Sequence, residues 1–571
     1  MTRSGAVMAW AGGDNSPAAV EVSATGAAAA AVHDAVGRLV SDRVASRLSE
    51  HDASLWGEAA AEEAAIRLGW TKLHDSSRDL LDPLAKLRAE LQAEGIERVV
   101  LCGMGGSSLA PEVMAGTAGV QLVVLDSTHP AQVARALDGD LAATVVVVAS
   151  KSGTTVETDS QRRAFTAAFA DAGIDPATRL IAVTDPGSAL ATIAREEGYR
   201  AVFEADPTVG GRFSALSAFG LVPAALAGVD VAALLDDAAQ VADILGEDHE
   251  ANPALVLAAA LAATAPLRDK IVITDAGSGL YHFGDWAEQL LAESTGKEGK
   301  GLLPIIVDSA APELRSGAAN VLPVLLCPQE RHDEAPPAAA GGEDDDDGVL
   351  VAATEVTVAG SLGAMFLLWE HAVAIAGRLL GINPFDQPNV ESAKQAARGL
   401  LDDTPPPSPV AFEDSGVVVF ASPAVPEGST TLSQAVSALL DQIPEDGYLA
   451  VMAYLDREGR GAQLLKPVRS ALARRTQLPV TFGWGPRFLH STGQYHKGGP
   501  ARGVFLQLTD RPTHRVSIPG RDFDFGSLIA AQAAGDARVL TELGRPVLRL
   551  QVTGPDALAW LAGMLAAPGT P

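Results

Sequence analysis

Five short, continuously apolar runs between residues 98 and 204 place the strongest constraint on the fold. They are RVVLCG (98–103), VQLVVLD (120–126), TVVVVAS (144–150), RLIAVTD (179–185) and YRAVFE (199–204), and helical patterns separate them. Strands without polar alternation are buried on both faces, and the crossovers between them make such strands parallel. We therefore predict a doubly wound parallel sheet, which binds ligands at the carboxyl ends of its strands.

A second set of apolar runs predicts a further sheet of the same class. It comprises KIVITDAG (270–277), VLPVLLC (321–327), GVLVAATEV (348–356), GVVVFAS (416–422) and YLAVMAYL (448–455), while residues 27–94 have helical spacing. We expect an α/β protein with four parts. These are an N-terminal helical segment (1–95), a first α/β domain (96–265), a second α/β domain (266–481) and a C-terminal segment that packs on the site (482–571).

Charge and cysteine content narrow the functional classes. The formal net charge of −29 disfavours binding to nucleic acid or to anionic membranes. Cys102 and Cys327 are the only cysteines, so we expect neither a disulfide framework nor a cysteine zinc site. The first residues, MTRSGAVMAWAGGDNSP, lack the apolar core of a secretory signal. We expect a cytoplasmic enzyme without a metal site and interpret the acidic segment 333–348 as a solvated loop.

A glycine-rich turn follows the first of these strands. In GMGGSSL, Gly105 and Gly106 allow a ligand to approach the backbone, and Ser107 and Ser108 open a helix whose N–H groups favour an anion. The pattern lacks the third glycine of a dinucleotide fingerprint. By itself the turn is weak evidence for phosphate binding.

A hydroxyl-rich loop, SKSGTTVET (150–158), follows the third strand and strengthens that interpretation. Ser150, Ser152, Thr154 and Thr155 can surround one tetrahedral anion at the start of a helix. The alternative is a helix-capping cluster with Glu157 as the capping-box partner, which accounts for one or two hydroxyls only. The loop therefore predicts a phosphate site.

An ordered set of motifs resembles the glucose-6-phosphate isomerases of the sugar-isomerase (SIS) fold. The motifs are GMGGSSLAP, SKSGTTVET, GGRFSALSAFG (210–220), EQLLAESTGKEGKG (288–301) and WEHAVAIAGRLLGINPFDQPNVESAKQAA (369–397). Together with FGWGPRFLHSTGQYHKGGP (482–500), the chain resembles the isomerase half of transaldolase–isomerase fusion enzymes. The resemblance implies two SIS-type doubly wound domains with flanking helices, and a homodimer.

The resemblance also implies the reaction, which is the reversible isomerisation of glucose 6-phosphate to fructose 6-phosphate through a cis-enediol(ate), without any cofactor. The sugar phosphate would be held by the Ser150, Ser152 and Thr155 hydroxyls and by the backbone of Gly106, Ser107 and Lys151. The proton-shuttling base would be Glu293, at the end of a helix, and Arg212 would stabilise the enediolate. Taken alone, an exposed helix glutamate and a structural arginine remain the simpler interpretations.

Ring opening is assigned less directly. The resemblance implies that Lys394 acts near the ring oxygen and that Gln387 contacts the substrate, although Lys394 can equally pair with Glu391 on a solvated face. Family members carry a histidine block soon after the base, and the neighbouring subunit supplies that histidine. Here the similar residues are His490 and His496, about 200 residues later, with His332 as the remaining candidate. We expect His490 to act in a site that a second subunit completes.

Two other functions fit the same residues. A mannose-specific or dual-specific phosphosugar isomerase could use the whole set. A non-catalytic module that senses sugar phosphates would need only the phosphate site, and would leave Glu293, Arg212 and Lys394 unexplained.

Overall fold

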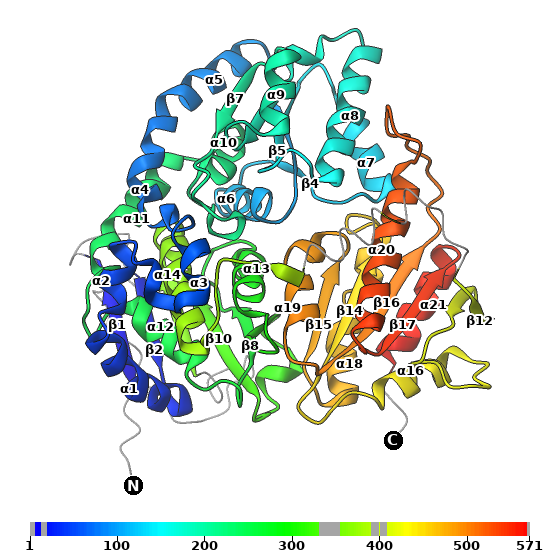
Figure 1. Ribbon diagram of the computed structural model, residues 1–571. Coiled ribbons are helices and arrows are strands. Elements are labelled where there is room, and N and C mark those ends of the chain that lie inside the picture. Colours follow the sequence, from blue (N-terminus) through cyan, green and yellow to red (C-terminus); the bar gives the residue numbers. More distant parts are fainter. Residues whose placement is uncertain (1–5, 13–19, 330–354, 390–398, 400–407, 568–571) are drawn as a thin grey trace.

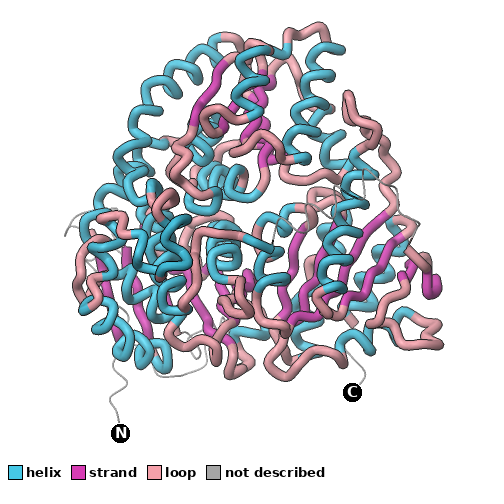
Figure 2. Tube along the Cα trace, viewed as in Figure 1, coloured by secondary structure: helices cyan, strands magenta, loops and turns pink. Residues whose placement is uncertain are grey.

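The computed structural model describes residues 6–12, 20–329, 355–389, 399 and 408–567. Figure 1 shows three groups of strands, and Figure 2 shows that helices flank each of them. The α/β class predicted from the apolar runs is confirmed.

The first sheet contains the five strands predicted between residues 98 and 204. Its order is β4-β3-β5-β6-β7, and all neighbours are parallel. The strands are β3 (Arg98–Gly103), β4 (Val123–Leu125), β5 (Thr144–Ala149), β6 (Leu180–Thr184) and β7 (Ala201–Glu204). The helices between them are α6 (Leu109–Thr117), α7 (Pro130–Leu137), α8 (Val156–Asp171) and α9 (Ala189–Glu196). Strand β5 is buried at every position, as expected for a strand covered on both faces.

The second sheet has the order β1-β2-β11-β10-β8-β9. Its strands are β1 (Val7–Ala11), β2 (Val20–Ala24), β8 (Lys270–Asp275), β9 (Leu303–Val307), β10 (Val321–Cys327) and β11 (Val356–Gly360). The four from β8 to β11 are parallel, whereas β2 pairs antiparallel with both β1 and β11. The N-terminal segment thus adds an edge hairpin, which we did not predict. Its predicted helices are present as α1 (Gly26–Ser41), α2 (Val44–Ser49), α3 (Glu58–Ala64), α4 (Leu73–Ser76) and α5 (Leu81–Ala93).

Helices fill the space between the first and second sheets. They are α10 (Ala218–Ala227), α11 (Val231–Leu245), α12 (Pro253–Ala262), α13 (Phe283–Thr295) and α14 (Leu362–Leu380). Helix α14 is long and apolar enough to cross a membrane, but 89% of its apolar stretch is buried inside the structure. It is therefore a core helix that α11, α12 and α13 contact.

A third sheet corrects one prediction. We expected the runs at 416–422 and 448–455 in the second sheet, but they belong to a separate sheet of order β12-β13-β17-β16-β14-β15. Its strands are β12 (Val410–Asp414), β13 (Val417–Phe420), β14 (Tyr448–Tyr454), β15 (Val480–Trp484), β16 (Gly503–Asp510) and β17 (Val547–Val552). Its helices are α16 (Leu432–Leu440), α17 (Arg460–Leu465), α18 (Val468–Thr476), α19 (Gly493–Gly498), α20 (Phe525–Glu542) and α21 (Pro555–Ala566). The predicted domain limits at 95, 265 and 481 stay a prediction.

The third sheet is docked on the first by buried charges. Arg487, after β15, contacts Asp126 at 2.6 Å and Glu112 at 2.5 Å, and Arg457 contacts the same two carboxylates at 3.2 and 3.3 Å. Burial would raise the pKa of Glu112, but the two arginines hold that pKa at about 2. Removing one partner of such a buried group typically costs about 3–5 kcal/mol. The cluster therefore fixes the third sheet against the carboxyl ends of the first.

Candidate active site

The glycine-rich turn after β3 approaches another backbone segment closely. Gly105 has φ +55°, and a Cβ added to Gly106 would lie 2.0 Å from the carbonyl oxygen of Gly211. The hydroxyl of Ser214 also donates to the Gly106 carbonyl at 3.2 Å. Only glycine allows this approach, and it places the turn against the segment that carries Arg212.

The hydroxyls after β5 form a cluster at the start of α8. Ser150 Oγ and Thr155 Oγ1 lie 3.2 Å apart, and Ser152 Oγ and Thr154 Oγ1 lie 2.8 Å apart. Thr155 is the N-cap residue of α8, yet its side chain makes no capping hydrogen bond. Thr155 therefore does not cap this helix through its side chain, whereas Ser150 and Ser152 accept hydrogen bonds from the backbone N–H groups of Gly153 and Thr154 within the loop. Together with the first turn of α8, these hydroxyls form a site suited to a phosphate.

The side chain of Lys151 is held by protein groups. Its ammonium donates to the carbonyl of Val209 at 2.7 Å and pairs with Asp185 at 3.0 Å. These contacts tie the hydroxyl loop to the chain just before Arg212. The backbone contact of Lys151 with a phosphate stays a prediction.

Glu293 lies in the last turn of α13 and is 4% exposed. Its Oε2 is 3.6 Å from Nη1 of Arg212 and accepts a hydrogen bond from Gln289 at 3.3 Å. The interpretation of Glu293 as an exposed helix glutamate is therefore wrong. A buried carboxylate beside a fixed cation is an arrangement suited to proton transfer at a carbon that becomes part of an anion.

The guanidinium of Arg212 is held from several sides and is itself buried. It donates to Ser294 Oγ (2.9 Å), Gln387 Oε1 (3.2 Å), and the carbonyls of Pro384 (2.6 Å) and Asp386 (2.9 Å). Burial lowers the pKa of Arg212 from its ordinary value, and the nearby Glu293 carboxylate opposes this shift. The structure thus brings together Arg212, Glu293 and Gln387, which we selected from separate motifs.

Lys297 is a second buried cation at this site that we did not single out. Its ammonium contacts the carbonyl of Asp386 at 2.6 Å and the Asp386 carboxylate at 2.7 Å. Burial, together with the nearby Arg212 charge, lowers the pKa of Lys297 to about 8. The available signal was its place in the motif AESTGK, four residues after Glu293.

His490 is the histidine that lies next to these elements. It ends a 3-10 helix at Arg487–His490, after β15, and its Nε2 is 3.2 Å from Oε1 of Glu157 on α8. Its carbonyl accepts a hydrogen bond from Gln289 of α13 at 2.8 Å. Glu157 is therefore a partner of this histidine, not a capping-box residue. One chain makes all of these contacts, and the expectation that a second subunit completes the site stays a prediction.

The other histidine candidates are placed differently. His496 is buried, its Nδ1 is 2.9 Å from the Tyr448 hydroxyl, and burial lowers its pKa well below the ordinary value. It is a packed core residue. His332 and Lys394 lie outside the described residues, as does the acidic segment 333–348.

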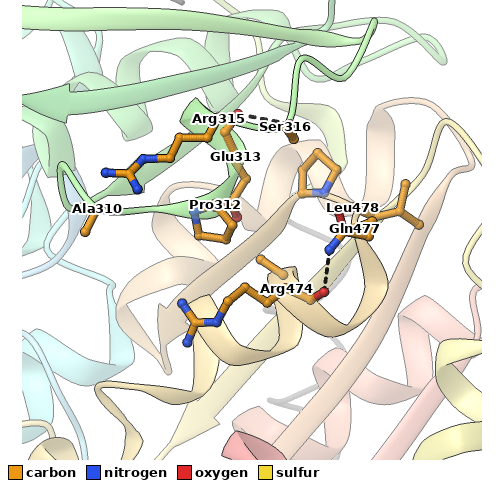
Figure 3. Close-up of a pocket in the computed structure, with 10 residues that line it drawn as sticks. Ala310, Pro312, Glu313, Arg315, Ser316, Arg474, Gln477 and Leu478 are labelled. Carbon is orange, nitrogen blue, oxygen red and sulfur yellow. Dashed lines mark hydrogen bonds between the residues drawn. The ribbon is translucent and has the colours of Figure 1, made fainter. Parts of the chain in front are cut away.

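In Figure 1, α6, α13 and α19 meet near the centre of the molecule, and the site lies among these helices. A separate cavity of about 330 Å³ lies between a 3-10 helix at Pro312–Leu314 and α18. Arg315 and Arg474 line it (Figure 3), but no candidate site residue does. Within the described ranges, no group of three or more His, Cys, Asp or Glu side chains could hold a metal ion.

Comparisons with known proteins agree on one family. The phosphoglucose isomerase family model matches residues 82–300. The chain is 32% identical to a probable glucose-6-phosphate isomerase of Haloarcula marismortui, over 53% of this chain and 78% of that protein. It is also 32% identical to a probable glucose-6-phosphate isomerase of Natronomonas pharaonis, over 63% of this chain and 92% of that protein.

A solved structure supports the fold. The hypothetical protein TT0462 from Thermus thermophilus is 28% identical, with a TM-score of 0.53, and the match covers 64% of this chain and 95% of that one. The sequence relatives and the family model, taken with the geometry above, lead to one conclusion. The chain belongs to the glucose-6-phosphate isomerase family.

Proposed function

We propose that the chain interconverts glucose 6-phosphate and fructose 6-phosphate, and that Glu293 is the base. The observation that carries this proposal is the buried Arg212–Glu293 pair, 3.6 Å apart, next to a turn and a hydroxyl loop that can hold a phosphate. A module that only senses a sugar phosphate needs the loop but not the pair. The pair therefore favours a catalyst.

Phosphate binding positions the substrate. The hydroxyls of Ser150, Ser152 and Thr155, with the N–H groups at the start of α8 and the backbone of Gly106, Ser107 and Lys151, would hold the phosphate of the sugar. A helix N-terminus and neutral donors bind an anion at short range, so the acidic character of the whole chain does not prevent binding. The open sugar chain then extends from this loop towards Arg212.

Proton transfer follows from the position of Glu293. The carboxylate removes the C2 proton of the open-chain aldose, and the electron pair of that bond forms the C1–C2 double bond while O1 becomes negative. Arg212 stabilises this negative charge because its guanidinium is already fixed by protein acceptors and needs no rearrangement. The protonated Glu293 then delivers the proton to C1, the hydroxyl proton of O2 passes to O1, and the ketose results.

Ring opening requires a second set of groups. We assign the exchange of protons at the ring oxygen and its hydroxyl to His490, with Lys394 as its partner. The Glu157 carboxylate beside Nε2 of His490 favours the tautomer that carries its proton on Nε2 and leaves Nδ1 as the acceptor. Gln387, which already accepts from Arg212, would contact the sugar hydroxyls.

The experiment is a rate measurement with purified protein. Conversion of fructose 6-phosphate is coupled to an NADP-dependent glucose-6-phosphate dehydrogenase, and mannose 6-phosphate is tested in parallel by its conversion to fructose 6-phosphate. Turnover of glucose and fructose phosphates is expected. Equal or faster turnover of the mannose phosphate would favour the dual-specific alternative, and absence of turnover on every sugar would leave only the sensing module.

Location and assembly belong to the same proposal. A cytoplasmic enzyme that acts on a soluble sugar phosphate fits the composition, and we propose a homodimer because the family resemblance implies one. Light scattering after size exclusion tests the assembly, and a monomeric mass would overturn that part of the proposal without affecting the reaction.

A further inference from the structure

His490 lies where parts of all three sheets meet. The residue itself follows β15 of the third sheet, its ring contacts Glu157 in the layer of the first sheet, and its backbone carbonyl is bound by Gln289 of α13. Gly105 closes the remaining side, since a Cβ there would lie 2.9 Å from the Cβ of His490. The histidine therefore has fixed neighbours on each side within one chain.

A second residue from the helices around the third sheet contacts Glu157. Gln532, in the middle of α20, is 3% exposed and donates from Nε2 to Oε1 of Glu157 at 2.7 Å. The Oε1 of Gln532 accepts a hydrogen bond from Thr128 at 2.6 Å. Because Thr128 fixes the amide from behind, the donor group of Gln532 faces the same carboxylate oxygen that contacts His490.

The geometry points to a site whose base, Glu293, and histidine, His490, belong to the same chain, and in which Gln532 is a positioning residue that acts through Glu157 on His490. This inference rests on the proposed isomerase function. The third sheet and its helices then supply two groups to the site. One is His490, and the other is Gln532, which orients the Glu157 partner of that histidine, while the base Glu293 lies on α13 of the same chain. The histidine then comes from the same chain as the base, whatever the oligomeric state.

Co-assembly of two inactive variants tests completeness. Glu293→Gln and His490→Ala are co-expressed with different tags, and the species carrying both tags is purified and assayed with the wild type beside it. If each chain holds its own site, every site in the double-tagged species lacks either the base or the histidine. That species then has only the summed residual activity of the two variants. If histidines crossed between subunits of a dimer, one of the two sites in the purified mixed dimer would hold both groups, and about half of wild-type activity would return.

The same experiment separates this inference from the proposed function. Restoration of about half of the activity would overturn the single-chain site while leaving the isomerase function intact. A wild type without turnover would overturn the proposed function, and this inference with it. A failure of the two variants to co-purify would show that the chain is monomeric, which supports a site made by one chain.

The role of Gln532 is tested by Gln532→Met, which keeps the volume and removes both hydrogen bonds. We expect kcat on glucose 6-phosphate to fall about 10-fold, because loss of a partner that orients a reacting group costs rate rather than affinity. KM and the inhibition constant of sorbitol 6-phosphate, which has no ring to open, are expected to change less than about twofold.

Gln507→Met is the matched control. Gln507 is also fully buried, lies on β16 of the same sheet, and donates to the carbonyl of Ala533 on α20 at 2.8 Å, but it contacts no site residue. Loss of kcat in Gln532→Met alone supports a positioning role, and equal kcat in both variants overturns it. If Gln532→Met does not fold, Thr128→Val removes only the bond behind the amide, and an unchanged kcat there would overturn the role.

Discussion

Replacing Glu293 by glutamine separates the charge of the proposed base from its shape. The amide keeps the size of the side chain and a hydrogen-bonding oxygen, but it cannot accept the C2 proton. Loss of a general base slows a reaction by ~10² to 10⁴-fold, which corresponds to about 3 to 5 kcal/mol of barrier height. KM should change little, because the proposed phosphate site lies on another loop.

The effect on stability can be worked out from the contacts of Arg212. Breaking a buried ion pair typically costs about 3–5 kcal/mol because the remaining charge loses its partner. Here the guanidinium keeps four other acceptors, which are Ser294, Gln387 and the carbonyls of Pro384 and Asp386. We therefore expect the free energy of unfolding of Glu293→Gln to fall by only about 1–2 kcal/mol, so that the folded variant can be assayed.

The assay is the coupled conversion of fructose 6-phosphate, with kcat and KM determined separately and unfolding followed by denaturant titration. Glu298→Gln is the control, because Glu298 lies five residues further along the same segment and is exposed. Its kcat should stay within about twofold of the wild type. A kcat of Glu293→Gln close to that of the wild type would refute the base assignment, and a large rise in KM with unchanged kcat would show a binding role instead.

Four further predictions concern the site and its surroundings. Ser152→Ala combined with Thr155→Ala should raise KM with little loss of kcat, because the phosphate is bound equally in ground and transition states; a fall in kcat alone would contradict the phosphate site. Chelation by EDTA should leave the rate unchanged, since Arg212 supplies the positive charge; a loss that added divalent metal restores would contradict this. His490→Ala should slow turnover of the ring-closed sugar, whereas His496→Ala should mainly lower Tm; the reverse pattern would exchange their roles. Burial raises the pKa of Glu288 from 4.5 to about 8, so the folded state holds this proton more tightly than the unfolded state. The free energy of unfolding should therefore decrease as the pH rises from about 4.5 to 8. Glu288→Gln should flatten that dependence in thermal melts at pH 5 and 8, and an unchanged slope would contradict the shift.

The amino-acid sequence determined the local parts of this protein. Continuous apolar runs specify strands covered on both faces, and all five runs between residues 98 and 204 form the parallel first sheet. The turn at Gly105–Gly106 and the hydroxyl loop at 150–155 follow strands directly. Because parallel sheets bind ligands at the carboxyl ends of their strands, this was enough to predict that both segments belong to one ligand site. These properties depend on residues close together in the chain.

The tertiary structure decided how distant segments combine. The later apolar runs look alike, and nothing in their pattern assigns β14 to a different sheet from β8, because strand partners are chosen by packing across the whole fold. Gln532 lies in an ordinary amphipathic helix, 375 residues from the carboxylate that it binds. That contact depends on how the third sheet packs on the first, where Arg487 also pairs with Asp126, 361 residues away in the chain.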